Sequence, residues 1–105
     1  MPQVIDLSRL TGNGKVKNLS GHDKGTAARR SFDLDVLDHS SEPVDVVVPP
    51  FVYAVSSSFV QGMFKPSLNV LGTLEAFFEH YRFVADAAVI RQIERALTPS
   101  RLAAA

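Results

Sequence analysis

The stretch VDVVVPPFVYAVSSSFVQGMF, from Val44 to Phe64, changes its hydrophobic period partway along. Residues 44–48 are almost continuously apolar and β-branched, which is typical of a central strand covered on at least one face. From Ser56 onward the apolar residues follow helical spacing: Phe59, Val60, Met63 and Phe64. The stretch therefore predicts a buried strand followed by a helix, from about Ser57, that packs against the sheet.

Upstream of this stretch, the sequence predicts two strands and a helix. Residues 4–7 and 15–19 are patterned as strands, and the Gly-Asn-Gly turn between them predicts an N-terminal hairpin over residues 1–19. The segment that follows predicts an irregular helix in which Arg29 and Arg30 point outward.

Downstream, helices and a strand alternate. Gly72 and Thr73 predict the end of one helix and the start of the next, and residues 81–84 predict a strand that a last helix follows. Strands that alternate with helices imply parallel neighbours joined by right-handed crossovers. Residues 1–105 are therefore expected to form one α/β domain, a small sandwich with a mixed sheet of about four strands and helices packed on it. Residues 98–105 are expected to be a flexible tail.

The composition is that of an ordinary soluble globular domain. Hydrophobic residues make up 46% of the 105 residues and charged residues 21%, so the chain is able to bury a core. Cysteine is absent, which fits a reducing compartment and leaves no thiolate for catalysis or metal binding. Asp6 and Arg9 would fall inside the apolar part of a secretion signal, and no run reaches the roughly 18 apolar residues of a membrane span. The expected location is the cytoplasm.

The zero net charge hides an uneven distribution. Residues 1–30 hold six basic and two acidic residues, whereas residues 31–50 hold five acidic residues and no lysine or arginine. The candidate basic patch consists of Lys15, Lys17, Lys24, Arg29 and Arg30. No aromatic residues interleave with this patch as a nucleic-acid stacking platform would require, so the pattern favours a protein partner or neutralisation within the fold.

No combination of residues predicts an enzyme active site, a metal site or a cofactor. The histidines His22, His39 and His80 lie in polar settings, and none has a nucleophile or a metal ligand at a familiar spacing. The turn at Ser57 lacks the flanking glycines of a nucleophile elbow. We therefore expect a protein without catalytic activity.

Three consecutive serines, Ser56, Ser57 and Ser58, stand at the start of the predicted central helix. One of them is needed as the N-cap, whose side-chain oxygen accepts a hydrogen bond from an amide two or three residues on. The others are either loop filler or a regulated, partner-contacting site, since a phosphate is tolerated at the positive end of a helix. We take Ser58 as the candidate phosphate acceptor, with Tyr53 and Phe59 on the same partner-binding surface.

Several short motifs follow one another in a known order: LSGH at 19–22 with KG at 24–25 and AR at 28–29, VDVVV at 44–48, VSSSF at 55–59 with Gly62 and Phe64, and YRF at 81–83. From Asn18 to Leu97 the chain thereby resembles the STAS-like family, small bacterial proteins formerly grouped as a domain of unknown function. The resemblance implies the fold of the STAS domain of anti-sigma-factor antagonists.

In the antagonists that share this fold, a turn of the type Asp-Ser-Ser-Gly-Leu carries a phosphoserine, which an ATPase-fold kinase phosphorylates. Aligned with that turn, Ser56 stands at the aspartate, Ser57 and Ser58 at the serines and Phe59 at the glycine. The resemblance implies a regulatory protein-interaction module that binds a histidine-kinase-type ATPase or another signalling partner.

Two other functions remain open at this stage. The basic patch fits a nucleic-acid-associated regulator, whose binding would fall steeply with added salt. A structural homo-oligomer, of which a homodimer is the simplest, would use an aromatic-rich surface near Phe51, Tyr53, Phe77 and Phe78.

Overall fold

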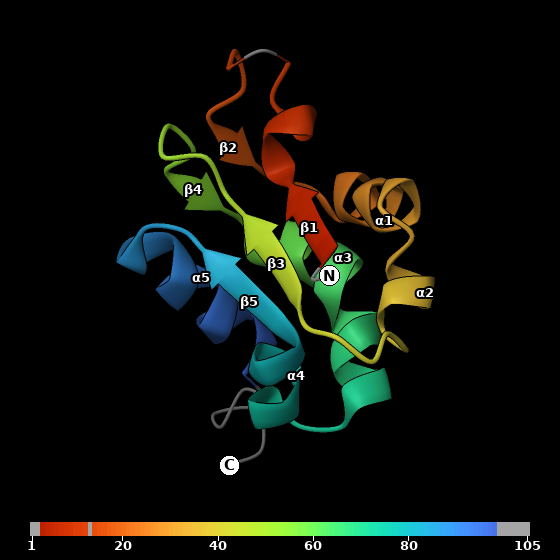
Figure 1. The fold of residues 1–105 in the computed structure, drawn as a ribbon. Coiled ribbons are helices and arrows are strands. Elements are labelled where there is room, and N and C mark those ends of the chain that lie inside the picture. The colour runs from red at the N-terminus through yellow and green to blue at the C-terminus, as the bar shows by residue number, and fades with distance from the viewer. Residues whose placement is uncertain (1–2, 13, 99–105) are drawn as a thin grey trace.

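The strand β3 (Val44–Val47) lies at the centre of the fold, as its apolar sequence predicts (Figure 1). A computed structural model of the chain describes residues 3–12 and 14–98. In it, β3 pairs in parallel with β1 (Gln3–Asp6) on one side and with β5 (Tyr81–Val84) on the other. The buried side chains of β3 alternate along the strand, as expected when helices cover one face of a sheet.

A second, two-stranded parallel sheet joins β2 (Asn18–Leu19) to β4 (Ala54–Val55). The expected mixed sheet of about four strands is therefore wrong, and so is the N-terminal hairpin over residues 1–19, because β1 and β2 pair with different partners. After β1 the chain coils into a 3-10 helix, η1 (Leu7–Leu10), that buries Leu7. By pairing with the apolar β3, β1 buries the side chain of Ile5. Residues 15–17 are exposed and rich in lysine, so pairing with them would not bury it.

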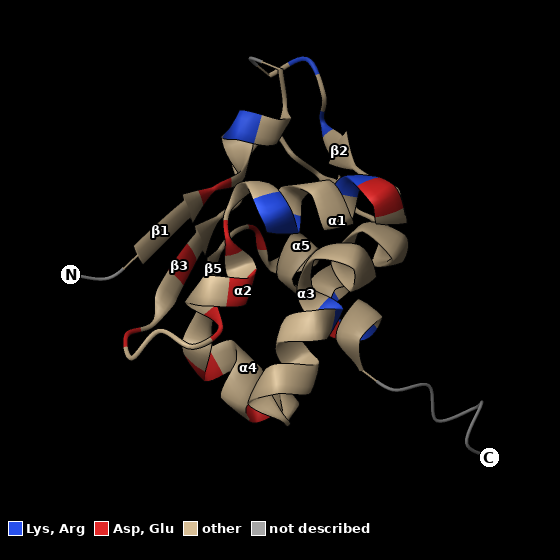
Figure 2. Cartoon of the chain, turned by 90° about the vertical axis from the view of Figure 1, so that its right-hand side faces the viewer, with Lys and Arg blue, Asp and Glu red and all other residues tan. Residues whose placement is uncertain are grey.

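The helices all lie on one side of the three-stranded sheet (Figure 2). They are α1 (His22–Ser31), α2 (Leu34–Leu37), α3 (Ser57–Leu71), α4 (Leu74–His80) and α5 (Ala87–Leu97). The longest, α3, packs between α1 and α5 and continues through Pro66. The molecule is thus an α/β domain with two layers, and the other face of the sheet carries exposed side chains such as Val4 and Val84.

The core forms where α3 meets the sheet. All four apolar residues of its predicted inner face, Phe59, Val60, Met63 and Phe64, are buried, which confirms the predicted packing of this helix. The Phe64 ring makes edge contacts with the rings of Tyr81 and Phe83 on β5, at centroid distances of 6.0 and 5.3 Å. Helix α3 is therefore fixed to the sheet by aromatic contacts near its middle.

Helices α1 and α3 cross at two glycines. A Cβ atom added at Gly25 would collide with the carbonyl oxygen of Phe59, and one added at Gly62 would collide with the carbonyl oxygen of His22. Each glycine thus lets the backbone of the other helix come into direct contact. Because the obstructing atoms are backbone, no side-chain rotation makes room, and the crossing needs glycine at both positions.

The predicted break between α3 and α4 is confirmed. Gly72 ends α3 with a φ of 97°, a left-handed conformation that glycine adopts without strain. Thr73 begins α4, and its side-chain oxygen accepts a hydrogen bond from the backbone N–H of Ala76 at 3.0 Å. At the C-terminus, Thr98 follows α5, and the remainder of the expected tail lies outside the described residues.

Candidate functional site

The serine turn before α3 has one capping residue, and it is Ser56. Its backbone is extended, with a φ of −73° and a ψ of 155°, and its Oγ accepts a hydrogen bond from the Phe59 amide at 3.2 Å. The same hydroxyl lies 3.1 Å from the Oγ of Ser58. Ser57 and Ser58 themselves are exposed on the first turn of the helix. The structure therefore separates one serine that the helix needs from two that it leaves accessible.

Tyr53 is the most exposed aromatic side chain of the described residues, with 63% of its surface accessible, although its backbone is held firmly. Its amide donates to the carbonyl oxygen of Lys17 at 3.0 Å. Two residues on, the Val55 amide donates to the side-chain oxygen of Gln92 on α5 at 2.8 Å. This segment, which leads directly into the serine turn, is thus fixed from both sides, so the tyrosine projects from an ordered support.

The other aromatic residues expected at a surface lie elsewhere. Phe59 is 2% exposed, so its side chain is not part of an outer binding surface. Phe77 is fully buried and Phe78 packs against it with a centroid distance of 5.0 Å. The expected surface near Phe51, Tyr53, Phe77 and Phe78 is therefore wrong as a unit, because the α4 pair fills the core beneath β5 and only Phe51 and Tyr53 remain exposed.

Four members of the candidate basic patch, Lys15, Lys17, Lys24 and Arg30, are exposed. In Figure 2, blue segments gather at the end of the molecule that carries β2 and the start of α1, while most red segments lie around α2, α4 and the strands. Arg29, which was expected to point outward, is 7% exposed. It faces α3 instead, because successive residues of a helix point about 100° apart and only one of two adjacent arginines shares the buried face.

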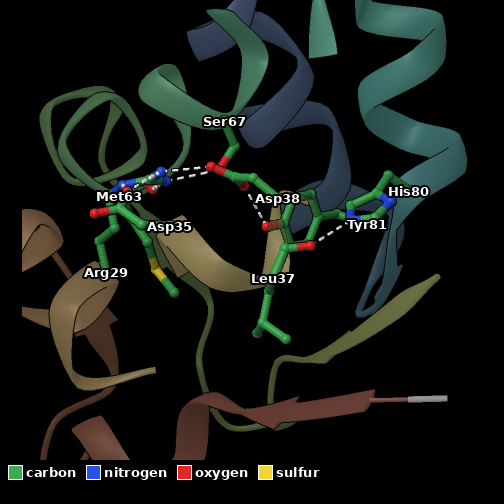
Figure 3. Close-up of polar contacts among 8 residues, drawn as sticks. All are labelled: Arg29, Asp35, Leu37, Asp38, Met63, Ser67, His80 and Tyr81. Atoms are coloured by element: carbon green, nitrogen blue, oxygen red, sulfur yellow. Dashed lines mark hydrogen bonds and ion pairs between the residues drawn. The ribbon is translucent and has the colours of Figure 1, made fainter. Parts of the chain in front are cut away.

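Arg29 is the centre of a buried polar network that joins four elements (Figure 3). Its NH2 group donates to the Asp38 carboxylate at 2.6 Å and to Asp35 at 2.7 Å. Its NH1 group donates to the Oγ of Ser67 at 2.6 Å and to the backbone oxygen of Met63 at 2.9 Å. The guanidinium thereby ties α1 to the end of α2 and, through Met63 and Ser67, to the middle of α3 and the turn that follows.

Asp38 is the acceptor that completes this network. Its Oδ1 accepts hydrogen bonds from the hydroxyls of Ser67 and Tyr81, both at 2.5 Å, while its Oδ2 binds Arg29. No buried side-chain nitrogen or oxygen of the described residues is left without a partner. A buried charge pair with its hydrogen bonds satisfied is tolerated in a core, so we interpret the network as structural.

The network shifts the titration of two of its members. Burial raises the pKa of the Tyr81 hydroxyl far above its ordinary value, and the hydrogen bond to Asp38 raises it further. Burial disfavours the charged guanidinium of Arg29, but hydrogen bonds to Asp38 and Asp35 outweigh this and raise its pKa. Both groups therefore keep their protons across the physiological range, and neither is poised to transfer one.

The histidines lie on separate elements. His22 begins α1 and His39 follows α2, and both are exposed. His80 ends α4, where its Nε2 atom lies 2.7 Å from the carbonyl oxygen of Leu37. Across residues 3–12 and 14–98, no three side chains of the metal-ligating types His, Cys, Asp and Glu come together.

Sequence reasoning located the serine turn and Tyr53 but missed the network. One signal was available in Ser67, a polar residue at a position where α3 otherwise buries Phe64 and Leu68. A hydroxyl at such a position needs a buried partner, although the sequence does not say which residue supplies it.

Comparison of the chain with protein-family models, with curated proteins and with solved structures found no match. Within the described part of the chain, no helix has the length and apolar character needed to cross a membrane.

Proposed function

We propose that this chain is a non-enzymatic regulatory module of the STAS-like type that binds a protein partner, such as a histidine-kinase-type ATPase. The binding surface consists of Tyr53, Ser57 and Ser58. The observation that carries the proposal is the exposure of Tyr53, 63%, on a backbone held by Lys17 and Gln92 beside the serine turn.

Tyrosine suits this role because it buries a large area at a small cost in side-chain entropy, and it is enriched among residues that dominate binding energy. Here the cost is lowered further, since the strand and Gln92 already order the backbone that carries the ring. Phe51, two residues upstream in the sequence, is a second aromatic residue that remains exposed, at 41%.

The exposed serines add a point of control. Ser56 is engaged as the cap, and it stands where the antagonist turn has an aspartate, a residue that caps helices equally well. Ser57 and Ser58 stand where that turn has its serines, and a phosphate at the N-terminus of the 15-residue helix α3 is electrostatically tolerated. We therefore assign Ser58 as the phosphate acceptor, whose modification would interrupt an apolar contact around Tyr53.

A photo-crosslinking amino acid tests this surface in the protein's native cells. Placed at Tyr53, it should capture one defined protein, whereas at Val36, which is 69% exposed on α2, it should not. Ser58→Asp should abolish the capture at Tyr53, and Ser58→Ala should preserve it. Equal capture at Tyr53 and Val36, or none at Tyr53, would overturn the proposal.

The alternative functions have less support from the geometry. Arg29, one of the five residues of the basic patch, is buried in the polar network and is not available to a nucleic acid. Phe77 is buried and Phe78 is partly buried in the core, so they do not form an aromatic surface for a homo-oligomer. Salt-dependent binding of nucleic acid, or a dimer in size-exclusion chromatography that Tyr53→Ala dissociates, would restore them.

A further inference from the structure

A cavity of about 310 Å³ opens beside α1, between this helix, β2 and the segment before β2. Its floor consists of buried apolar side chains: Leu19, Ala28 and Phe59. Its mouth is lined by Val16, Ala27 and Lys24, all exposed. A mostly apolar cavity of this size with a few polar groups at its rim is the usual form of a small-molecule site.

We propose that this cavity binds a small amphipathic anion, whose apolar body fills the floor and whose carboxylate lies at Lys24. A cavity of about 150 Å³ holds one benzene ring, so this one has room for an apolar body of about twelve carbon atoms. A medium-chain fatty acid has this chemistry.

The cavity exists because α1 presents small residues to it. Ala27 and Ala28 both line the cavity, and a larger residue such as leucine in their place would reduce its volume at only a small cost in helix propensity. Phe59, in the floor, is held in the core at 2% exposure. This part of the boundary is therefore fixed by core packing.

The charge at the mouth selects an anion. Lys24 is the charged residue among those lining the cavity, and in the described part of the chain it forms no ion pair. Lys15 and Lys17 stand next to Val16 in the sequence and are exposed, but they do not line the cavity, so Lys24 supplies the charge at its mouth. An ammonium group on a flexible stem next to an apolar floor suits a carboxylate at the end of an alkyl chain.

The site is independent of the proposed partner surface, but one residue links them. Phe59 lines the cavity, and its amide donates to the Ser56 hydroxyl that caps α3. Binding in the cavity would therefore be visible at the serine turn, as a change in the Phe59 amide resonance.

The test uses octanoate and the full chain, with binding followed by calorimetry and by chemical-shift changes of the Ala27, Ala28 and Phe59 resonances. Saturable binding that shifts these resonances supports the site, and 1-octanol should bind more weakly than octanoate because it lacks the charge. Lys24→Met should weaken octanoate binding about fivefold. Arg30→Met, which removes a positive charge from the same helix outside the cavity, should leave it unchanged.

A second pair of variants tests the cavity itself. Ala27→Leu should fill its mouth and weaken both octanoate and 1-octanol about tenfold or more. Ala88→Leu, at an exposed position of α5 away from the cavity, is the matched control. Melting temperatures near that of the parent protein establish that each variant is folded. The proposal is overturned if octanoate does not saturate, or if Lys24→Met and Arg30→Met weaken its binding equally.

Discussion

The two ends of helix α3 use serine in opposite ways. At its start, Ser57 and Ser58 are exposed and Ser56 holds one backbone amide. Near its end, Ser67 is fully buried, donates to Asp38 and accepts from Arg29. At the first end solvent reaches Ser57 and Ser58, so only the Ser56 cap depends on a hydroxyl, whereas at the second end the buried network has no substitute for Ser67. We therefore expect replacement of Ser57 or Ser58 to cost little stability, and replacement of Ser67 to cost much more.

The strongest way to break the buried end is to remove its acceptor. Asp38→Ala leaves the Arg29 guanidinium buried without its main partner and should lower the free energy of unfolding by about 3–5 kcal/mol. Asp35→Ala is the matched control, because the side chain of Asp35 is 84% exposed, and it should cost less than about 1 kcal/mol. Urea denaturation measures both. If both variants lowered the free energy of unfolding equally, the buried ion pair of Asp38 would contribute no more to stability than the exposed one of Asp35.

Removing the buried serine should have the next largest effect. Ser67→Ala takes away one donor to Asp38 and one acceptor for Arg29, and it should cost about 1–3 kcal/mol. Ser58→Ala on the same helix should stay within about 0.5 kcal/mol of the parent. The contrast between the two ends fails if urea denaturation ranks these variants in the opposite order.

Tyr81 adds a dependence on pH at the buried end. Its raised pKa means that, above about pH 10, the hydroxyl ionises in the unfolded chain but not in the folded one, so the free energy of unfolding falls as pH rises. Tyr81→Phe should cost about 1 kcal/mol at neutral pH and make this alkaline loss shallower. Stability curves of the parent protein and of Tyr81→Phe between about pH 8 and pH 11 test this, and equal alkaline slopes for the two proteins would contradict it.

The smallest expected effect concerns the N-cap at the start of α3. Ser56→Ala removes the cap and should cost about 1 kcal/mol, while Ser57→Ala and Ser58→Ala should be close to neutral. Thermal unfolding of the three single variants measures the difference. A loss at Ser58 as large as that at Ser56 would show that their mutual contact, and not the bond to Phe59, orders the turn.

The sequence was sufficient to predict the elements whose residues share one strong period. The β-branched run of β3 and the helical spacing from Phe59 to Phe64 both follow from burial of one face, and Gly72 and Thr73 are local signals that need no tertiary context. The pairing of the strands was not available in the same way. The Gly-Asn-Gly turn predicted a hairpin, but β1 gains more buried area against β3 than against the polar segment around Lys15.

The start of α3 at the three serines was predicted, but not which serine caps it. Any of three serines could cap the helix, and only the extended backbone of Ser56 selects it. Likewise, adjacent residues such as Arg29 and Arg30, or Phe77 and Phe78, look alike in sequence, and their burial depends on which face of the helix meets a neighbour. Tertiary packing decides which of two adjacent residues is buried, and a single sequence does not contain that information.

The parallel pairing of the described strands also bears on how the chain folds. Partners such as Gln3 and Val44, or Val44 and Tyr81, are roughly forty positions apart, so each strand pair closes a long loop. Helices, whose contacts are local, form sooner than such pairs. During synthesis the three-stranded sheet is completed only after Tyr81–Val84 have left the ribosome, so most of the chain is made before its central strand has both neighbours.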